Sequence, residues 1–379
     1  MKIVIAPQGF KGNLTALQVA RAIEEGIKRV VPDTQTTIKP MADGGEGTVQ
    51  ALVDATGGKM IATEVTGPLG KPVTAQWGIL SDKVTAVIEM AAASGLPLVP
   101  PEKRDPLVTT THGTGELVVA ALDNGCRKLI TGIGGSATND GGAGMAQALG
   151  ARLLDAKGKE LPSGGTALAQ LERIDISQMD SRLTDFKVTL ASDVNNPLCG
   201  PNGASAIYGP QKGATETQVR QLDAALSHYA DIIQRDLGID LRDAPGAGAA
   251  GGLGLGLMVF LKARPIPGID VVIKATDLMA DLEGADLVFT AEGRIDCQSA
   301  MGKVPTGVAL KAKEFGLPVI ALAGEVTDDC RIIYEQGIDA VVSIAPGPIT
   351  LNQSMAEAEK LIGNAAECAM RVFVCRVKE

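Results

Sequence analysis

A glycine-rich loop in the first half of the chain carries residue types that could bind phosphate. Gly132–Gly142 follows a β-branched run at Lys128–Thr131 and precedes a helical pattern at Ala143–Leu149. Glycines let the backbone approach a ligand closely, and a helix N-terminus favours negative charge. The predicted phosphate-binding residues are Gly134, Gly135, Ser136, Thr138 and Asn139. Asp140 could hold a metal ion, and the alternative is a glycine turn that only packs closely.

Charged residues recur in other glycine-containing turns, mostly where expected strands end. Asp43 and Glu46 precede an expected helix, so they could also be its N-cap and the capping-box partner. The other charged residues of this kind are Asp193, Lys212, Glu292, Arg294 and Asp296. Carboxylates beside Lys and Arg, without a His or Cys nucleophile, favour metal-assisted phosphoryl transfer over acyl transfer.

Two spacings resemble dinucleotide-binding fingerprints but lack the required context. Gly246-x-Gly248-x-x-Gly251 is preceded by Asp-Ala-Pro instead of a strand, and Gly132-x-Gly134-x-x-Ala137 has no acidic strand end about twenty residues on. A dehydrogenase is therefore only an alternative enzyme class. The P-loop spacing GxxxxGK[ST] is also absent, so a kinase would need another fold.

The composition indicates a globular chain of two domains. The 379 residues are 45% hydrophobic but only 3% aromatic, which suits buried parallel strands built from Val, Ile, Leu and Ala. The net charge of −9 argues against nucleic acid as a partner. The six cysteines show no CxxC spacing, and neither a signal peptide nor a membrane span is apparent. We expect a soluble, cytoplasmic protein with reduced thiols.

Strand and helix patterns alternate at both ends of the chain. Residues 2–6, 36–39, 286–290, 319–323 and 340–344 are the expected strands. Thr15 could cap the first helix, and this alternation predicts an α/β fold with a doubly wound, mainly parallel sheet. Between two turn-rich junctions, the sequence pattern changes to alternating strands, several glycine loops and one long helix. We expect a first domain formed by 1–66 and 265–379, with a second α/β domain inserted at 67–264.

Several long motifs resemble the two-domain bacterial glycerate kinases (the type 1 family). They lie at 41–48, 88–96, 113–116, 134–142, 209–214, 246–252 and 292–296. The resemblance implies transfer of the ATP γ-phosphate to D-glycerate, usually at the 2-hydroxyl, which gives 2-phosphoglycerate. It also implies a flavodoxin-like domain, an inserted domain and an active site in the cleft between them. Glycerate 3-kinase, or a kinase of a related hydroxy acid, is the alternative activity.

Within this resemblance, Asp193 is expected to orient the hydroxyl and accept its proton. Lys11, Lys212 and Arg294 are candidates for binding the substrate carboxylate and the phosphates. The pool of Mg²⁺ ligands is Asp43, Glu46, Asp140, Glu292 and Asp296. The expected partners are D-glycerate and the nucleotide, without nucleic acid or membrane, in a monomer or a homodimer.

One loop departs from the family pattern. Where the family has Ala-Pro-Asp-Ser-Phe-Lys-Gly-Ser, this chain has Gln8, Gly9 and Asn13 in place of the Asp and the two Ser residues. The loss of a carboxylate could alter metal binding, substrate choice or activity. A catalytically silent sensor, or a two-lobed small-acid binding protein, is the alternative of another class.

Overall fold

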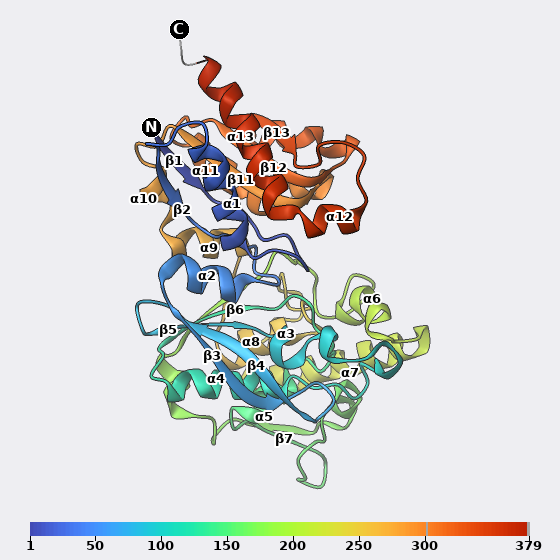
Figure 1. The fold of residues 1–379 in the computed structure, drawn as a ribbon. Helices are drawn as coiled ribbons and strands as arrows, with labels where there is room; N and C mark the ends of the chain where they lie inside the picture. The colour runs from blue at the N-terminus through green and yellow to red at the C-terminus, as the bar shows by residue number, and fades with distance from the viewer. Residues whose placement is uncertain (301, 377–379) are drawn as a thin grey trace. The chain divides into compact units, whose positions relative to one another are not determined.

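The computed structural model describes residues 1–300 and 302–376, and they form two compact units. Unit 1 comprises Met1–Asp43, Gln50–Gly57 and the chain from Ile269 onward. Unit 2 comprises Gly44–Val49 and Gly58–Gly268. Each unit is built around its own sheet (Figure 1).

The sheet of unit 1 is parallel throughout and has the strand order β13-β12-β11-β1-β2. Its strands are β1 (Lys2–Ile5), β2 (Gln35–Ile38), β11 (Leu287–Ile295), β12 (Val319–Val326) and β13 (Ala340–Ser343). Counted within the unit, this is the order 2-1-3-4-5 of flavodoxin-like sheets. The predicted doubly wound α/β fold is confirmed.

Helices α1 (Ala16–Lys28) and α13 (Ala358–Arg376) pack together in unit 1 (Figure 1). Thr15 begins α1 with a capping box to Gln18, as its sequence predicts. The apolar faces of both helices share one core with alternate residues of the strands, including Ile3 and Phe289. A third helix, α11 (Val304–Lys313), packs on β11. These layers hold the strand ends in fixed positions.

Unit 2 contains a mixed sheet of strand order β10-β9-β6-β5-β4-β3. β5 (Thr85–Glu89), β6 (Lys128–Gly132), β9 (Lys187–Ala191) and β10 (Arg264–Ile266) are parallel, whereas β3 (Lys59–Thr66) and β4 (Pro72–Ile79) are antiparallel. From the sequence, residues 59–66 were expected in the first domain. Their full ladder with β4 places them in the second sheet, because strand pairing depends on partners outside the local sequence.

The long helix α7 (Glu216–Leu237) of unit 2 lies where the sequence predicted a helix. Residues of α5 (Ala143–Ala148) and α8 (Leu253–Phe260) share a core with it, whereas α4 (His112–Asp123) contributes to a second core of the unit. Trp77 and Tyr229 are fully buried, and small aliphatic residues fill most of the rest of the core. None of the described helices combines the length and apolar character needed to cross a bilayer.

Candidate functional site

Several predicted site residues of unit 1 lie at or near the carboxyl ends of its strands. The chain leaves β1 toward β2 on one side, while β11 pairs with β1 on the other side. This reversal of direction makes the β1/β11 edge the switch point, where open α/β sheets bind ligands. Gln8 follows β1, and Glu292 and Arg294 lie near the end of β11.

A cavity of about 440 Å³ opens at this edge of the sheet. Its charged and polar lining comprises Gln8, Lys11, Asn13, Glu292, Arg294, Asp296, Lys303, Glu325 and Ser354. Its apolar lining comprises Phe10, Ile344, Leu351, Met355 and Ala358, and the remaining lining residues are glycines. The volume is within the range of small-molecule sites.

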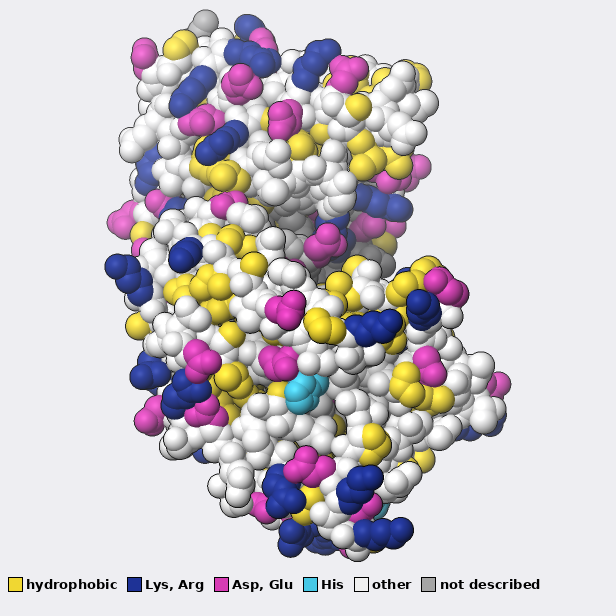
Figure 2. Space-filling view, turned by 60° about the horizontal axis from the view of Figure 1, so that its bottom comes forward, with side chains coloured by type: hydrophobic (Ala, Val, Ile, Leu, Met, Phe, Trp, Pro, Cys, Tyr) yellow, Lys and Arg dark blue, Asp and Glu magenta, His cyan; other side chains and the backbone are white. Residues whose placement is uncertain are grey.

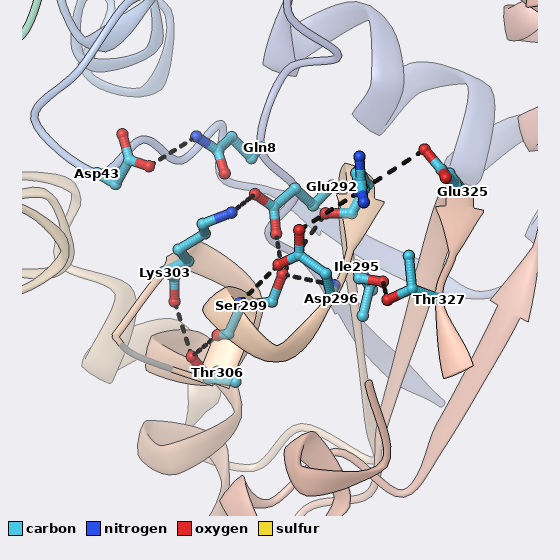
Figure 3. Close-up of polar contacts among 11 residues, drawn as sticks. Gln8, Asp43, Glu292, Ile295, Asp296, Ser299, Lys303, Thr306, Glu325 and Thr327 are labelled. Carbon is cyan, nitrogen blue, oxygen red and sulfur yellow. Dashed lines mark hydrogen bonds and ion pairs between the residues drawn. The ribbon is translucent and has the colours of Figure 1, made fainter. Parts of the chain in front are cut away.

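Glu292 is the most completely enclosed carboxylate of this cavity. Lys303 Nζ lies 3.2 Å from its Oε1, and Ser299 Oγ donates to its Oε2 at 3.0 Å (Figure 3). Burial raises the pKa of Glu292, although Lys303 and Ser299 oppose that shift. Thr306 Oγ1 bonds the carbonyl oxygens of Ser299 and Lys303 and so fixes the segment that carries both partners.

The structure corrects the secondary structure expected around Glu292 and Arg294. We expected both residues in a turn after a strand that ended at Thr290. β11 instead continues to Ile295, because β12 pairs with it as far as Val326. Arg294 Nε lies 3.4 Å from Asp296 Oδ2 and 3.7 Å from Glu325 Oε2, so its charge is shared between two carboxylates.

Gln8 replaces the expected acidic residue and is almost fully buried. Its Nε2 donates to Asp43 Oδ2 at 3.1 Å (Figure 3). A carboxylate accepts hydrogen bonds only, so this contact fixes which end of the amide is nitrogen. Gln8 Oε1 is buried and has no hydrogen-bond partner among the described residues. Asp43 is not the N-cap of the following helix, which was the alternative role, since α2 (Thr48–Thr56) begins five residues later.

In unit 2, only the first part of the glycine loop is open to solvent. Gly134 and Gly135 are exposed, whereas Ser136 is buried and Thr138 and Asn139 are fully enclosed. Asn139 Nδ2 donates to Ser205 Oγ at 2.9 Å. The structure therefore presents backbone at Gly134 and Gly135, while the predicted donors Thr138 and Asn139 point into the core.

Asp140, expected as a possible metal ligand, lies just before α5 and is held by protein donors. Its carboxylate accepts hydrogen bonds from Thr111 N, Thr111 Oγ1, Gly142 N and Gly144 N. Burial raises the pKa of Asp140 and these four donors oppose the shift. Because this side chain already satisfies the start of α5, that helix end is closed to an anion.

Lys212 lies inside the protein and not in an open loop. It is 1% exposed, and its Nζ donates to Thr138 O at 2.7 Å. Burial lowers the pKa of Lys212 to about 7, with Asp140 acting in the opposite direction. Lys212 therefore anchors the buried part of the glycine loop, and its ammonium group faces a protein carbonyl.

The segment Gly44–Val49 packs against the strand ends of unit 2. A side chain at Gly132 would meet Gly44 O at 2.3 Å, so this approach requires glycine. Glu46 is exposed in this segment. Glu89, at the end of β5, accepts from Val49 N at 2.8 Å, and burial raises its pKa. Glu89 was not among the predicted site residues, although a carboxylate at the end of a buried strand was a usable signal.

Two further predicted site residues, Asp193 and Lys11, are also open to solvent. Asp193 is exposed just beyond β9, and its Oδ1 accepts from Gly268 N at 2.9 Å. Lys11 is exposed at the cavity of unit 1. On the face seen in Figure 2, basic and acidic side chains are interspersed. Within the described residues, no three His, Cys, Asp or Glu side chains gather into a metal-binding group.

The family of this chain follows from its similarity to known proteins. The model of the Glycerate kinase family matches residues 3–374. The chain belongs to this family. A glycerate kinase of Bacillus subtilis is 55% identical over 97% of this chain and 96% of its own. The glycerate 2-kinase of Escherichia coli is also 55% identical, over 93% of each chain.

A solved structure extends the family relationship to the fold. The protein of Salmonella typhimurium LT2 provisionally named glycerate kinase 2 superposes with a TM-score of 0.92. It is 50% identical and the alignment covers 100% of this chain and 99% of the other. Membership of this family makes the protein a kinase.

Proposed function

We propose that this protein is an ATP-dependent kinase that phosphorylates D-glycerate at its 2-hydroxyl and forms 2-phosphoglycerate. The family match along nearly the whole chain supports the reaction, and a kinase of this family implies ATP as the donor. The relative from Escherichia coli named glycerate 2-kinase supports the choice of hydroxyl. The geometric observation that carries the proposal is the cavity at the switch point of unit 1, where carboxylates and cations converge.

Phosphoryl transfer needs positioning and charge neutralisation more than covalent chemistry by the protein. In the proposed reaction the 2-hydroxyl oxygen bonds to the γ-phosphorus, and the bond from that phosphorus to the bridging oxygen breaks. The hydroxyl proton passes to Asp193, whose Oδ1 is already oriented by Gly268 N. ADP leaves with the electrons of the broken bond.

The residues of unit 1 fit a magnesium ion that accompanies the nucleotide. Mg²⁺ is usually held by one or two carboxylates together with phosphates and water. Glu292 and Asp296 line the cavity, and Gln8 leaves one buried oxygen without a partner there. We assign Glu292 and Asp296 as its protein ligands. When bound, Mg²⁺ would neutralise phosphate charge. Asp140 does not fit, because four protein donors already hold its carboxylate.

The glycine loop of unit 2 contributes through its backbone. The exposed amides of Gly134 and Gly135 are available to phosphate oxygens, and glycine allows the close approach that this needs. Lys212 acts through Thr138 as a positioning residue, since its ammonium group bonds that carbonyl inside the protein. A loop anchored in this way keeps its exposed amides in place when a ligand binds.

The test is production of ADP by the purified protein with D-glycerate, ATP and Mg²⁺, together with NMR identification of the phosphorylated carbon. Asp193→Asn keeps the shape of the side chain but removes its basicity. Turnover should fall by about 10²–10⁴-fold, the usual contribution of a positioned base, while affinities and melting temperature change little. Absence of ADP production by the wild type would refute the function. Near-normal turnover by Asp193→Asn would refute only the role of Asp193.

A further inference from the structure

We propose that the cavity of unit 1 is the nucleotide subsite, with the purine ring of ATP at its apolar end and the phosphates at its charged end. The assignment rests on the proposed kinase function and adds which part of the chain binds which part of the nucleotide. The apolar lining comes mainly from 344–358, which follows the edge strand β13, and the charged lining mainly from 292–303, which continues the inner strand β11. The assignment follows from this difference, from the position of the cavity on the sheet and from groups in it that lack a partner.

The apolar end of the cavity exposes hydrophobic surface that the fold itself does not cover. Leu351, the first residue of α12 (Leu351–Ala356), is 74% exposed, and Met355 on the same helix is 37% exposed. Phe10, Ile344 and Ala358 line the same cavity and are buried. Burying such surface against a flat aromatic ring is favourable, and methionine sulfur makes good contacts with aromatic rings.

The charged lining also includes a cation with no carboxylate partner among the described residues. Arg294 and Lys303 both have carboxylate partners within 4.0 Å. Lys11 lines the same cavity, is exposed and has no ion pair within the described part of the chain. An unpaired ammonium group next to apolar surface matches a ligand that is anionic at one end and aromatic at the other.

Specific polar contacts hold the lining of the cavity in place. Asn13 Nδ2 donates to Met355 O at 3.1 Å and so joins the loop that carries Lys11 to the helix that carries Leu351. Gln8 is 3% exposed and leaves its Oε1 without a partner at the cavity wall. An unpartnered buried acceptor is costly, and a ligand or bound water that donates to it would remove the cost. The lining also lies at the switch point of the sheet.

Glycerate alone fits this cavity poorly. It has three carbons and an oxygen on each, so it has no apolar part that could cover Leu351 and Met355. The volume of about 440 Å³ is also that of a site for a much larger ligand. A nucleoside triphosphate supplies both the ring and the negative charge.

The experiment measures binding of two probes with Mg²⁺ in excess: the non-hydrolysable ATP analogue AMP-PNP and inorganic tripolyphosphate. Leu351→Ser should weaken AMP-PNP by about tenfold and leave tripolyphosphate unchanged, because only the ring loses its contact. Lys11→Met should weaken both probes. Val372→Ser, at a 70% exposed apolar position on α13, is the matched control and should change neither.

Leu351→Ser should fold, because Leu351 follows the Thr350 cap and serine is tolerated at the start of a helix. Unchanged AMP-PNP affinity in Leu351→Ser would overturn the subsite. An equal decrease in the affinities for AMP-PNP and tripolyphosphate would also overturn it, and so would a decrease in the affinity for D-glycerate. If the wild type makes no ADP with D-glycerate but the two probes separate as expected, the proposed function fails and the nucleotide subsite stands.

Discussion

Gln8 is the residue at which this chain departs most sharply from the loop of the family it belongs to. Its amide connects Asp43 to the cavity. Nε2 donates to the Asp43 carboxylate, and Oε1 is buried without a hydrogen-bond partner among the described residues. A neutral side chain here limits the negative charge in a cavity that already contains Glu292 and Asp296. The substitution therefore changes the local charge balance as well as one hydrogen bond.

Gln8→Asp should make the folded state depend on divalent cations. The new carboxylate would lie beside Asp43 and lose the hydrogen bond that Gln8 donates, so we expect a loss of about 1–3 kcal/mol in unfolding free energy without metal. Mg²⁺ should restore more of the melting temperature in Gln8→Asp than in the wild type. Gln8→Asn, which has the same length without the charge, is the control. Equal responses of all three proteins to Mg²⁺ would contradict our placement of the metal.

Lys212 should make stability depend on pH in a defined direction. Its pKa is 10.5 when unfolded and about 7 in the folded protein. Between these values the unfolded chain binds more protons, so stability rises with pH. The cost of burying the charge is complete below pH 7, decreases as the pH rises and is absent above 10.5. The slope for one such group is at most ~1.4 kcal/mol per pH unit.

The comparison that isolates this effect is Lys212→Met, which keeps the bulk of the side chain but cannot titrate. Denaturant unfolding of both proteins at several values between pH 6.5 and 9.5 gives the difference in unfolding free energy. That difference should shift in favour of the wild type as the pH rises, since all other groups titrate in both. A constant difference across the range would show that Lys212 keeps the same proton in the folded and unfolded states.

At the scale of elements, the contact between α1 and α13 joins the two ends of the chain. Gly26 on α1 lies against the backbone of α13. A Cβ there would lie 2.2 Å from Gly363 O and 2.8 Å from Ala366 Cβ. The helices can pack this closely only because Gly26 has no side chain.

Gly26→Ala should therefore destabilise the protein, although alanine is the better helix former by about 1 kcal/mol. We expect a net loss of about 1–3 kcal/mol, because the backbone of α13 must move away from α1. Thermal or urea unfolding would measure it. Glu25→Ala, at the exposed neighbouring position, should change stability by less than about 0.5 kcal/mol. A gain in stability from Gly26→Ala would mean that the helices are less tightly packed than the structure indicates.

Elements whose bounds depend on local patterns could be predicted from the sequence, and elements whose bounds depend on pairing could not. The strands and helices of both chain ends follow from local patterns, as the capping box of Thr15 and the buried run of β1 show. The length of β11 could not be predicted, because its last residues are held by pairing with β12. The periodicity of a single strand contains no information about that partner.

The candidate site was predictable in composition but not in orientation. The sequence identified Glu292, Arg294 and Asp296 as a charged group, and all three line one cavity. It also assigned Thr138 and Asn139 to a ligand, whereas they are buried by contacts with Lys212 and Ser205, more than 60 residues further on. A local pattern shows where glycines loosen the backbone. It does not show which side of the loop the rest of the protein covers.

At the scale of the whole molecule, unit 1 is assembled from segments at opposite ends of the chain. The cavity lining comes from residues 8–13, 292–303, 324–325 and 344–358, although unit 2 intervenes in the sequence. A ligand that binds there should therefore protect several distant segments at the same time. Hydrogen exchange on the intact protein can measure this without any change to the chain.

We expect AMP-PNP with Mg²⁺ to slow amide exchange in peptides that contain residues 8–13 and 351–358. Exchange should stay unchanged around β7 (Arg152–Leu154) and β8 (Arg173–Asp175), a hairpin of unit 2 outside the cavity lining. In Leu351→Ser, at a concentration that saturates only the wild type, protection should decrease in both segments, although only one carries the substitution. If protection is confined to the peptide that contains Leu351, the nucleotide does not bridge the two ends of the chain, and the cavity is not one binding site.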